Sequence, residues 1–134
     1  MVQKINRALI KKYDLDIGVV YFYKNFVVTE IKDETVMNFD KAAVLFRLCK
    51  KYYGNKTPFV YISNRVNSYS FEPTAHFKSV PLFPNLKGYS AVIYNKVSND
   101  IAEMERNFLV NVPTEIFYSL EEAINWVDQL IIRD

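Results

Sequence analysis

Cysteine and histidine are nearly absent from this sequence, and their scarcity excludes several kinds of site. The 134 residues include one Cys and one His. A single Cys excludes an internal disulfide and every zinc site built from cysteine pairs. A single His also removes histidine-rich metal sites, so we expect neither a metal centre nor a cofactor.

Glycine, proline and long apolar runs are scarce as well. The chain has 3 Gly and 5 Pro against 50% hydrophobic residues, a balance that indicates a folded core rather than a disordered chain. No apolar run reaches the roughly 18 residues that a membrane span needs. The basic N-terminus also lacks the apolar block of a secretion signal. We therefore expect one cytoplasmic domain over residues 1–134, with no membrane span.

Basic and acidic residues are nearly equal in number, with 17 Lys+Arg, 15 Asp+Glu and a net charge of +2. Nucleic-acid-binding domains usually carry a clearer basic excess, so the composition argues against a nucleic-acid partner. Four basic residues do precede the first acid: Lys4, Arg7, Lys11 and Lys12. A solvated terminus or charged edge strand accounts for them, and a patch for phosphate or lipid headgroups is the alternative.

The first part of the chain has the pattern of β-strands. Residues 17–23 and 26–31 are rich in β-branched and aromatic side chains, which favour strands. Only Lys24 and Asn25 separate the two runs, so we predict a hairpin with a two-residue turn. An earlier strand is expected around residues 8–15.

The rest of the chain alternates between helices and strands. Apolar residues recur at steps of three and four from Phe39 to Tyr53, which predicts a helix. Asn38 or Asp40 is expected to cap its start, and Gly54 to close its end. Thereafter we expect a strand at 59–62, a weak helix between 72 and 80, a strand at 88–94, a helix opened by Asn99 or Asp100, a strand at 114–118 and a final helix opened by the capping box of Ser119 and Glu122.

This order predicts an α/β protein with a mixed, mostly parallel sheet and right-handed crossovers. The N-terminal hairpin adds antiparallel strands at one edge, and about four helices cover at least one face. The apolar face expected for the helix near residue 100 consists of Ile101, Met104, Phe108 and Leu109.

Three stretches carry a resemblance to a known superfamily: residues 26–31 (FVVTEI), 61–70 (YISNRVNSYS) and 116–126 (IFYSLEEAINW). On these residues the chain resembles small bacterial proteins of the STAS/SpoIIAA-like superfamily, including members from marine Bacteroidetes-type bacteria. This is the fold of sporulation anti-sigma-factor antagonists. The chain is also similar to the lipid-binding CRAL-TRIO (SEC14-type) fold. The resemblance implies a SpoIIAA-like sheet and a non-enzymatic regulatory or protein-interaction module.

The resemblance also implies a phosphorylation switch. In the antagonists a strand delivers an Asp-Ser-Ser-Gly-type turn, in which a partner kinase phosphorylates a serine. The corresponding strand here is 59–62, and the residues through Ser70 lack that motif. Ser68 and Ser70 are the positional candidates, and a kinase or another regulator is the expected protein partner.

The polar residues of the same segment form a candidate ligand site. Arg65 with Ser63, Asn64 and Asn67 follows a central strand, where open α/β sheets bind ligands. A phosphate or carboxylate could bind there, and Arg65 could stabilise a phosphoserine. The structural alternative is that the Asn and Ser side chains satisfy a tight connection while Arg65 pairs with a local acid.

No catalytic set can be assembled, so the sequence does not predict an enzyme. No Gly-x-Ser-x-Gly elbow exists to present a nucleophilic serine to His76. Cys49 falls on the apolar face of the first helix, where a packed core thiol is expected.

Aromatic residues are numerous, with 10 Tyr and 10 Phe. Tyr21, Phe22 and Tyr23 are consecutive, so they must face both sides of the sheet. Helices, a partner subunit or a ligand could cover the second side, and a homodimer through these strands is compatible with the pattern. The alternative function is a CRAL-TRIO-like protein that binds a small apolar or lipid-like ligand, in a cavity lined by Phe71, Phe77, Leu82 and Phe83.

Overall fold

The computed structural model describes residues 7–67, 69–72, 78–107, 109 and 112–131. Eight strands, three α-helices and one 3-10 helix form within this part of the chain. In order they are β1 (Lys11–Leu15), β2 (Gly18–Phe22), β3 (Phe26–Ile31), β4 (Val36–Met37), α1 (Phe39–Tyr53), β5 (Phe59–Asn64), β6 (Ser70–Phe71), η1 (Val80–Leu82), β7 (Leu86–Val92), α3 (Lys96–Arg106), β8 (Thr114–Phe117) and α4 (Leu120–Ile131).

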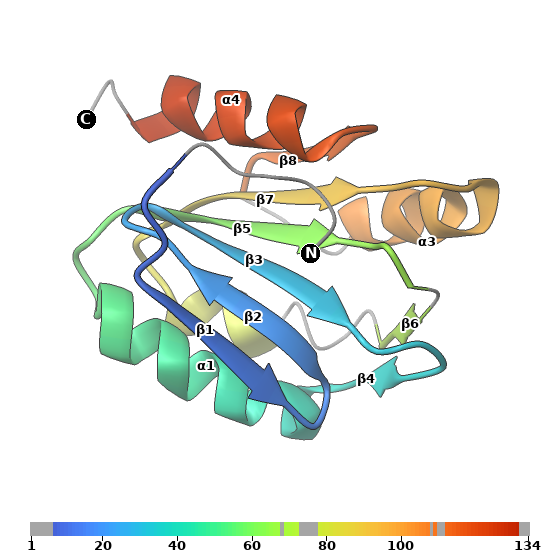
Figure 1. Ribbon diagram of the computed structural model, residues 1–134, viewed down its shortest axis with the longest axis horizontal. Helices are drawn as coiled ribbons and strands as arrows, with labels where there is room; N and C mark the ends of the chain where they lie inside the picture. Colours follow the sequence, from blue (N-terminus) through green and yellow to red (C-terminus); the bar gives the residue numbers. More distant parts are fainter. Residues whose placement is uncertain (1–6, 68, 73–77, 108, 110–111, 132–134) are drawn as a thin grey trace.

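Six strands form one sheet in the order β1-β2-β3-β5-β7-β8 (Figure 1). β1, β2 and β3 pair antiparallel, while β3, β5, β7 and β8 pair parallel. The Tyr23 N–H donates to the Phe26 carbonyl at 2.9 Å across the two-residue turn. The predicted α/β sheet, mostly parallel with an N-terminal antiparallel hairpin, is therefore confirmed. β4 and β6 form a separate small parallel pair.

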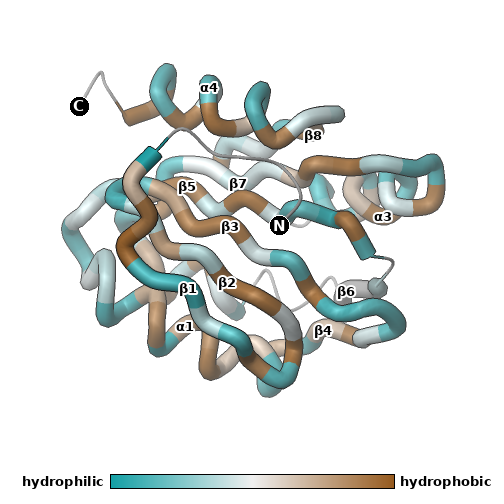
Figure 2. The backbone as a smooth tube through the Cα atoms, viewed as in Figure 1, coloured by the Kyte–Doolittle hydropathy of each residue, from teal (hydrophilic) through white to brown (hydrophobic). Residues whose placement is uncertain are grey.

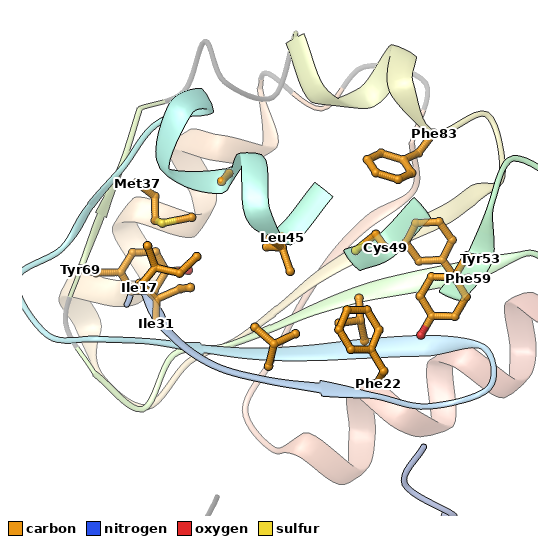
Figure 3. Packing of buried hydrophobic residues seen from close by; sticks show 13 residues of the cluster. Ile17, Phe22, Ile31, Met37, Leu45, Cys49, Tyr53, Phe59, Tyr69 and Phe83 are labelled. Atoms are coloured by element: carbon orange, nitrogen blue, oxygen red, sulfur yellow. The ribbon is translucent and has the colours of Figure 1, made fainter. Parts of the chain in front are cut away.

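Helices cover both faces of this sheet. On one face, Leu45 and Cys49 of α1 share a hydrophobic cluster with Phe22 of β2 and Phe59 of β5 (Figure 3). On the other face, α4 packs against a second cluster that includes Val28 of β3. Hydrophobic residues run along β2, β3 and β5 between these helices (Figure 2). Strands buried on both faces need such nearly continuous apolar sequences.

The run of three aromatic residues in and after β2 points to the two faces in turn. Phe22 stacks on Tyr52 of α1, with 4.5 Å between ring centres, while Tyr21 and Tyr23 belong to the cluster under α4. All three side chains are at most 5% exposed. Helices, rather than a second subunit, therefore cover these aromatic rings.

α1 begins and ends as its sequence predicts. The Asn38 side chain accepts a hydrogen bond from the Lys41 N–H at 2.8 Å. At the other end, the Gly54 N–H donates to the Lys50 carbonyl at 2.9 Å. Gly54 has a φ of 57°, a conformation that glycine adopts without steric cost.

α4 starts after Ser119 and packs closely against β7 at a glycine. The Glu122 N–H donates to the Ser119 hydroxyl at 3.2 Å, which is the serine half of the predicted capping box, and the same hydroxyl donates to the Glu122 carboxylate at 3.2 Å. A Cβ at Gly88 would lie 2.7 Å from Leu130 Cδ1 and 2.9 Å from Trp126 Cη2. The missing side chain at position 88 therefore allows α4 to approach the sheet this closely.

The start of α3 corrects the prediction. The helix begins at Lys96, not near Asn99 or Asp100. Its N-cap is Asn95, whose side chain accepts from the Ser98 N–H at 2.8 Å. Asn95 and Asn99 are both suitable N-cap residues. Because β7 ends at Val92, the helix starts at the first of them.

The buried face of α3 corrects the prediction as well. Of the residues expected in the core, Met104 is 47% exposed and Ile101 is half-buried, whereas Leu109 is buried but follows the helix. Phe108 lies outside the described residues. The side chains that face the sheet are instead Ser98, Ala102 and Glu105. Apolar periodicity could not predict this face, because it consists of small residues and one carboxylate that is paired inside the protein.

The expectation of about four helices is wrong for the described residues, which form three α-helices. The weak helix expected between 72 and 80 falls largely on 73–77, which are not described. Of its described residues, Lys78 and Ser79 are helical and lead into the 3-10 helix η1. η1 has a proline at its start, a position that needs no N–H donor. β1 is also shorter than expected, since it starts at Lys11.

Candidate functional site

Two buried polar clusters lie at the carboxyl ends of β3, β5 and β7. Neighbouring residues of a strand point to opposite faces, so Thr29 and Ser63 lie on the α1 side while Glu30 and Asn64 lie on the α4 side. These four residues are at most 7% exposed. Open α/β sheets bind ligands beyond this edge, which makes both clusters candidate sites.

The first cluster is centred on Arg65. Its Nη1 lies 2.5 Å from the Glu105 carboxylate of α3, and the two side chains are 2% and 1% exposed. Its Nη2 donates to the Tyr89 hydroxyl and its Nε to the Ser63 hydroxyl, each at 3.1 Å. The guanidinium also lies 5.4 Å from the centre of the Tyr69 ring. Arg65 is therefore held by residues from β5, β7 and α3.

The electrostatics of this cluster favour a closed ion pair. Burial by itself would lower the pKa of Arg65, but the Tyr69, Tyr89 and Glu105 side chains reverse this effect and raise the pKa above its ordinary value. The Tyr89 hydroxyl donates to the second Glu105 oxygen at 3.1 Å. Burial, and next the Glu105 charge, raise the pKa of Tyr89. An anionic ligand on Arg65 would have to replace the Glu105 carboxylate.

Tyrosines extend the first cluster along the sheet. The Tyr61 ring stacks on Tyr89, with 5.3 Å between ring centres and 4° between planes. The Tyr61 hydroxyl accepts from Thr29 at 3.1 Å, and the Ser63 and Tyr69 hydroxyls lie 2.6 Å apart. Burial raises the pKa of Tyr61 and of Tyr69. These hydroxyls therefore stay protonated near neutral pH and act as hydrogen-bonding groups.

The second cluster connects a buried carboxylate to an exposed tyrosine. The Asn64 amide donates to Glu30 Oε2 at 2.9 Å, and the Tyr94 hydroxyl donates to Asn64 Oδ1 at 2.6 Å. The Tyr21 hydroxyl donates to Glu30 Oε1 at 3.3 Å. Burial and the Glu30 charge raise the pKa of Tyr21 to about 12. Tyr94 is 42% exposed, so this cluster fixes a side chain at the surface.

The predicted site residues separate in the structure. Ser63 and Arg65 share the first cluster, Asn64 belongs to the second, and the Asn67 amide donates to the Ile31 carbonyl at 3.0 Å. Ser68 lies outside the described residues. Ser70 starts β6, and its side chain is not described. The ligand and phosphorylation roles given to these residues stay predictions.

The sequence did not identify the partners that complete the Arg65 cluster. Glu105 lies in the helix expected near residue 100, whose predicted inward face contained only apolar residues. The available signal was its spacing from Ser98 and Ala102, which places the three on one face of the helix. Tyr89 was counted only as a strand residue.

Exposed apolar side chains lie beside these clusters. Tyr94 follows β7 and Tyr118 follows β8, and the two line an open hollow together with Lys96 of α3. Tyr118 is 71% exposed. Two aliphatic side chains are exposed in the adjoining segments, Val66 after β5 at 41% and Val97 in α3 at 62%. We call Val66, Tyr94, Val97 and Tyr118 the carboxyl-edge surface.

A small apolar cavity of about 50 Å³ lies between α1, η1 and the sheet. Of the residues predicted to line a ligand cavity, Phe83 lines this one, while Leu82 is 41% exposed. Phe77 and the side chain of Phe71 are not described. Cys49 forms part of the wall, and burial raises the pKa of its thiol to about 12.

Among the described residues, which do not include His76, the Cys, Asp and Glu side chains form no group of three or more that could hold a metal ion. The helices of the described segments are all too short or too polar to cross a bilayer.

The fold is thus an α/β sheet covered on both faces, with two polar clusters and an exposed surface at its carboxyl edge. Comparison with known proteins finds no matching family model, no matching curated protein and no matching solved structure. The function is therefore inferred from the residues and their geometry.

Proposed function

We propose that this protein is a non-enzymatic protein-interaction module of the STAS type, and that it binds its partner through the carboxyl-edge surface. A mostly parallel sheet with an N-terminal hairpin is compatible with the STAS resemblance. Val66 of this surface belongs to the segment 63–70, which contains the serines that the resemblance points to. Exposed aromatic side chains are enriched at the centres of protein interfaces.

The anchoring of Tyr94 is the observation that carries this proposal. Its ring is 42% exposed, yet its hydroxyl is bound at 2.6 Å to Asn64, which is bound in turn to Glu30. A ring that is already fixed loses little conformational entropy when a partner covers it. The buried polar cluster thus prepares a surface side chain for binding.

The Arg65 cluster supports a structural rather than a catalytic role for its residues. Arg65, Glu105 and Tyr89 contact one another within the core, at distances of 2.5 to 3.1 Å. Such a network fixes the loop after β5 and the helix α3 that together flank the carboxyl-edge surface.

Site-specific photo-cross-linking tests the proposal. Benzoylphenylalanine is incorporated at Tyr118 or Tyr94, and in a third variant at Leu82, which is 41% exposed in η1. After irradiation in the host cell, we expect positions 118 and 94 to yield the same defined protein adduct and position 82 to yield none. The adduct partner is then purified, and Tyr118→Ala should weaken its binding by about tenfold or more, as loss of a central aromatic does.

Two results would contradict this function. Adducts of identical composition at all three positions would show that the surface has no preference for a partner. Unchanged affinity in both Tyr94→Ala and Tyr118→Ala, with Leu82→Ala as the matched control, would remove the carboxyl edge as the binding surface.

Phosphorylation at Ser68 or Ser70 is a proposed switch of the same surface, because segment 63–70 leads directly from it. The test is the intact mass of the protein purified from its host. A phosphoryl group mapped to either serine supports the switch, and an unmodified chain under all growth conditions contradicts it.

Binding of a small apolar ligand is the second candidate, and the cavity behind Cys49 is its only support among the described residues. At about 50 Å³ it is far below the roughly 300–1,000 Å³ of pockets for drug-sized ligands. Native mass spectrometry separates the two candidates, since a mass that is lost on denaturation would favour the ligand-binding function.

A further inference from the structure

The strand β1 forms an open edge of the sheet. Among the described residues, β2 is the only strand that pairs with β1. The outer side of β1 therefore presents backbone N–H and C=O groups that another strand can pair with. Lys11, Lys12 and Asp14 of this strand have exposed side chains.

Charge is distributed unequally along this edge. Its first half carries Lys11 and Lys12. Lys51 of α1 lies near this strand as well, because its Nζ is 5.5 Å from the centre of the Tyr52 ring. The Tyr52 hydroxyl is in turn 2.7 Å from the Tyr13 hydroxyl of β1.

The second half of the edge is mainly acidic. Asp14 and Asp16 line an open hollow with Glu34 and with one basic residue, Lys41. Neither Lys12 nor Asp14 forms an ion pair with another described residue. One end of the edge is thus complementary in charge to the other end.

We propose that a second copy of this chain docks on β1 in the antiparallel direction, with Tyr13 opposite Tyr13 of the other copy. A twofold axis makes both partners use the same surface. The antiparallel direction brings the basic end of each copy to the acidic end of the other, whereas a parallel copy would place like charges together.

Symmetry restricts the register to few choices. When a twofold axis relates two antiparallel edge strands, the same face of both sheets points to the same side. An even-numbered residue therefore lies opposite an even-numbered residue of the other copy, and an odd-numbered residue opposite an odd-numbered one. Centring the pair on Lys12 or on Asp14 would oppose two like charges. Centring it on Tyr13 places Lys12 of each copy opposite Asp14 of the other copy, so two pairs of opposite charge form.

The charge reversals Lys12→Asp and Asp14→Lys test this register by sedimentation velocity. Each single variant converts both cross-strand pairs into like charges, and we expect dimerisation to weaken by about tenfold or more. The double variant restores both pairs, so its dimerisation should return to within about threefold of the original. An equimolar mixture of the two single variants should form a heterodimer, because each copy then offers the charge that the other lacks.

Lys87→Asp is the matched control, since it makes the same change of charge at an exposed position of β7. All of these positions are exposed, and circular dichroism checks that each variant is folded. A protein that stays monomeric up to millimolar concentration overturns the proposal, and the edge lysines then serve to prevent pairing. A dimer that the reversals leave unchanged, or that the double variant does not restore, also overturns it. β1 and β8 are opposite edges of the sheet, so this test is independent of the carboxyl-edge surface.

Discussion

Arg65 and Glu105 form an ion pair of 2.5 Å between side chains that are 2% and 1% exposed. Arg65 directly follows β5, whereas Glu105 lies in the last turns of α3. The other inward side chains of α3, Ser98 and Ala102, bury little apolar surface. The pair therefore ties the last turn of this helix to the carboxyl end of β5.

Removing one partner of this pair should destabilise the protein strongly. Glu105→Ala leaves a buried guanidinium without its counter-charge, and we expect the free energy of unfolding to fall by about 3–5 kcal/mol. Urea denaturation followed by circular dichroism measures this change. Glu103→Ala is the control, because Glu103 pairs with Arg106 at 3.6 Å on the surface and should cost less than about 1 kcal/mol.

The double replacement Arg65→Met with Glu105→Leu distinguishes the pair from its packing. We expect it to cost much less than the sum of the single replacements, since no buried charge is left. Equal losses for Glu105→Ala and Glu103→Ala would show that α3 does not depend on the pair.

Gly88→Ala should weaken the contact between α4 and the sheet. The new methyl group would lie 2.7 Å from Leu130 and 2.9 Å from Trp126, and overpacking of this kind costs about 1–3 kcal/mol. Combining it with Leu130→Ala should recover part of the loss, as measured by thermal unfolding. A Cβ at position 54 would have no neighbouring atom within 4 Å. The loss of stability in Gly54→Ala should therefore simply add to the loss in Leu130→Ala.

Stability should fall at alkaline pH, and Tyr21 should account for part of the slope. Burial, and next the charge of Glu30, raise its pKa from 10 to about 12 in the folded state. The folded protein therefore retains the proton that the unfolded chain loses. This contribution to stability is complete below pH 10 and declines as the pH rises towards about 12.

Urea denaturation at several pH values above 9 measures this slope. Tyr21→Phe should flatten it, whatever the variant costs at neutral pH. Tyr118→Phe, at a position that is 71% exposed, should leave the slope unchanged. A slope that is identical in both variants would contradict the assignment to Tyr21.

Cys49 should react with a thiol reagent only when the protein opens. The thiol is 2% exposed, and burial raises its pKa to about 12, so little thiolate exists near neutral pH. Labelling by DTNB should therefore follow the rate of local or global unfolding. A Leu82→Cys variant supplies an exposed thiol that should react rapidly in the same sample. Equally fast reaction of Cys49 would show that the cavity beneath α1 opens readily.

Local signals predicted most of the fold. The run from Phe39 to Tyr53 is a helix with the residues expected at its two ends, Asn38 and Gly54. The hairpin turn at Lys24 and Asn25 is equally local. In each case the information lies within a few neighbouring residues, where caps, turns and periodicity act directly on the backbone.

The candidate site was predicted only in part, because its geometry depends on residues far apart in the chain. Arg65 was correctly placed after a central strand, and one alternative held that it pairs with a local acid. The acid is Glu105, forty positions further along. No periodicity indicates such a pair, since a charged residue on an inward helix face reads as an exposed one.

The sequence by itself determined the alternation of strands and helices, the antiparallel start and the parallel remainder of the sheet, because each follows from patterns of two to fifteen neighbouring residues. The tertiary structure decided which face of α3 is buried, which serines and asparagines share a cluster, and that Tyr94 is fixed at the surface. These outcomes depend on the balance between desolvation and pairing of polar groups. That balance exists only once β3, β5, β7 and α3 bring the groups together.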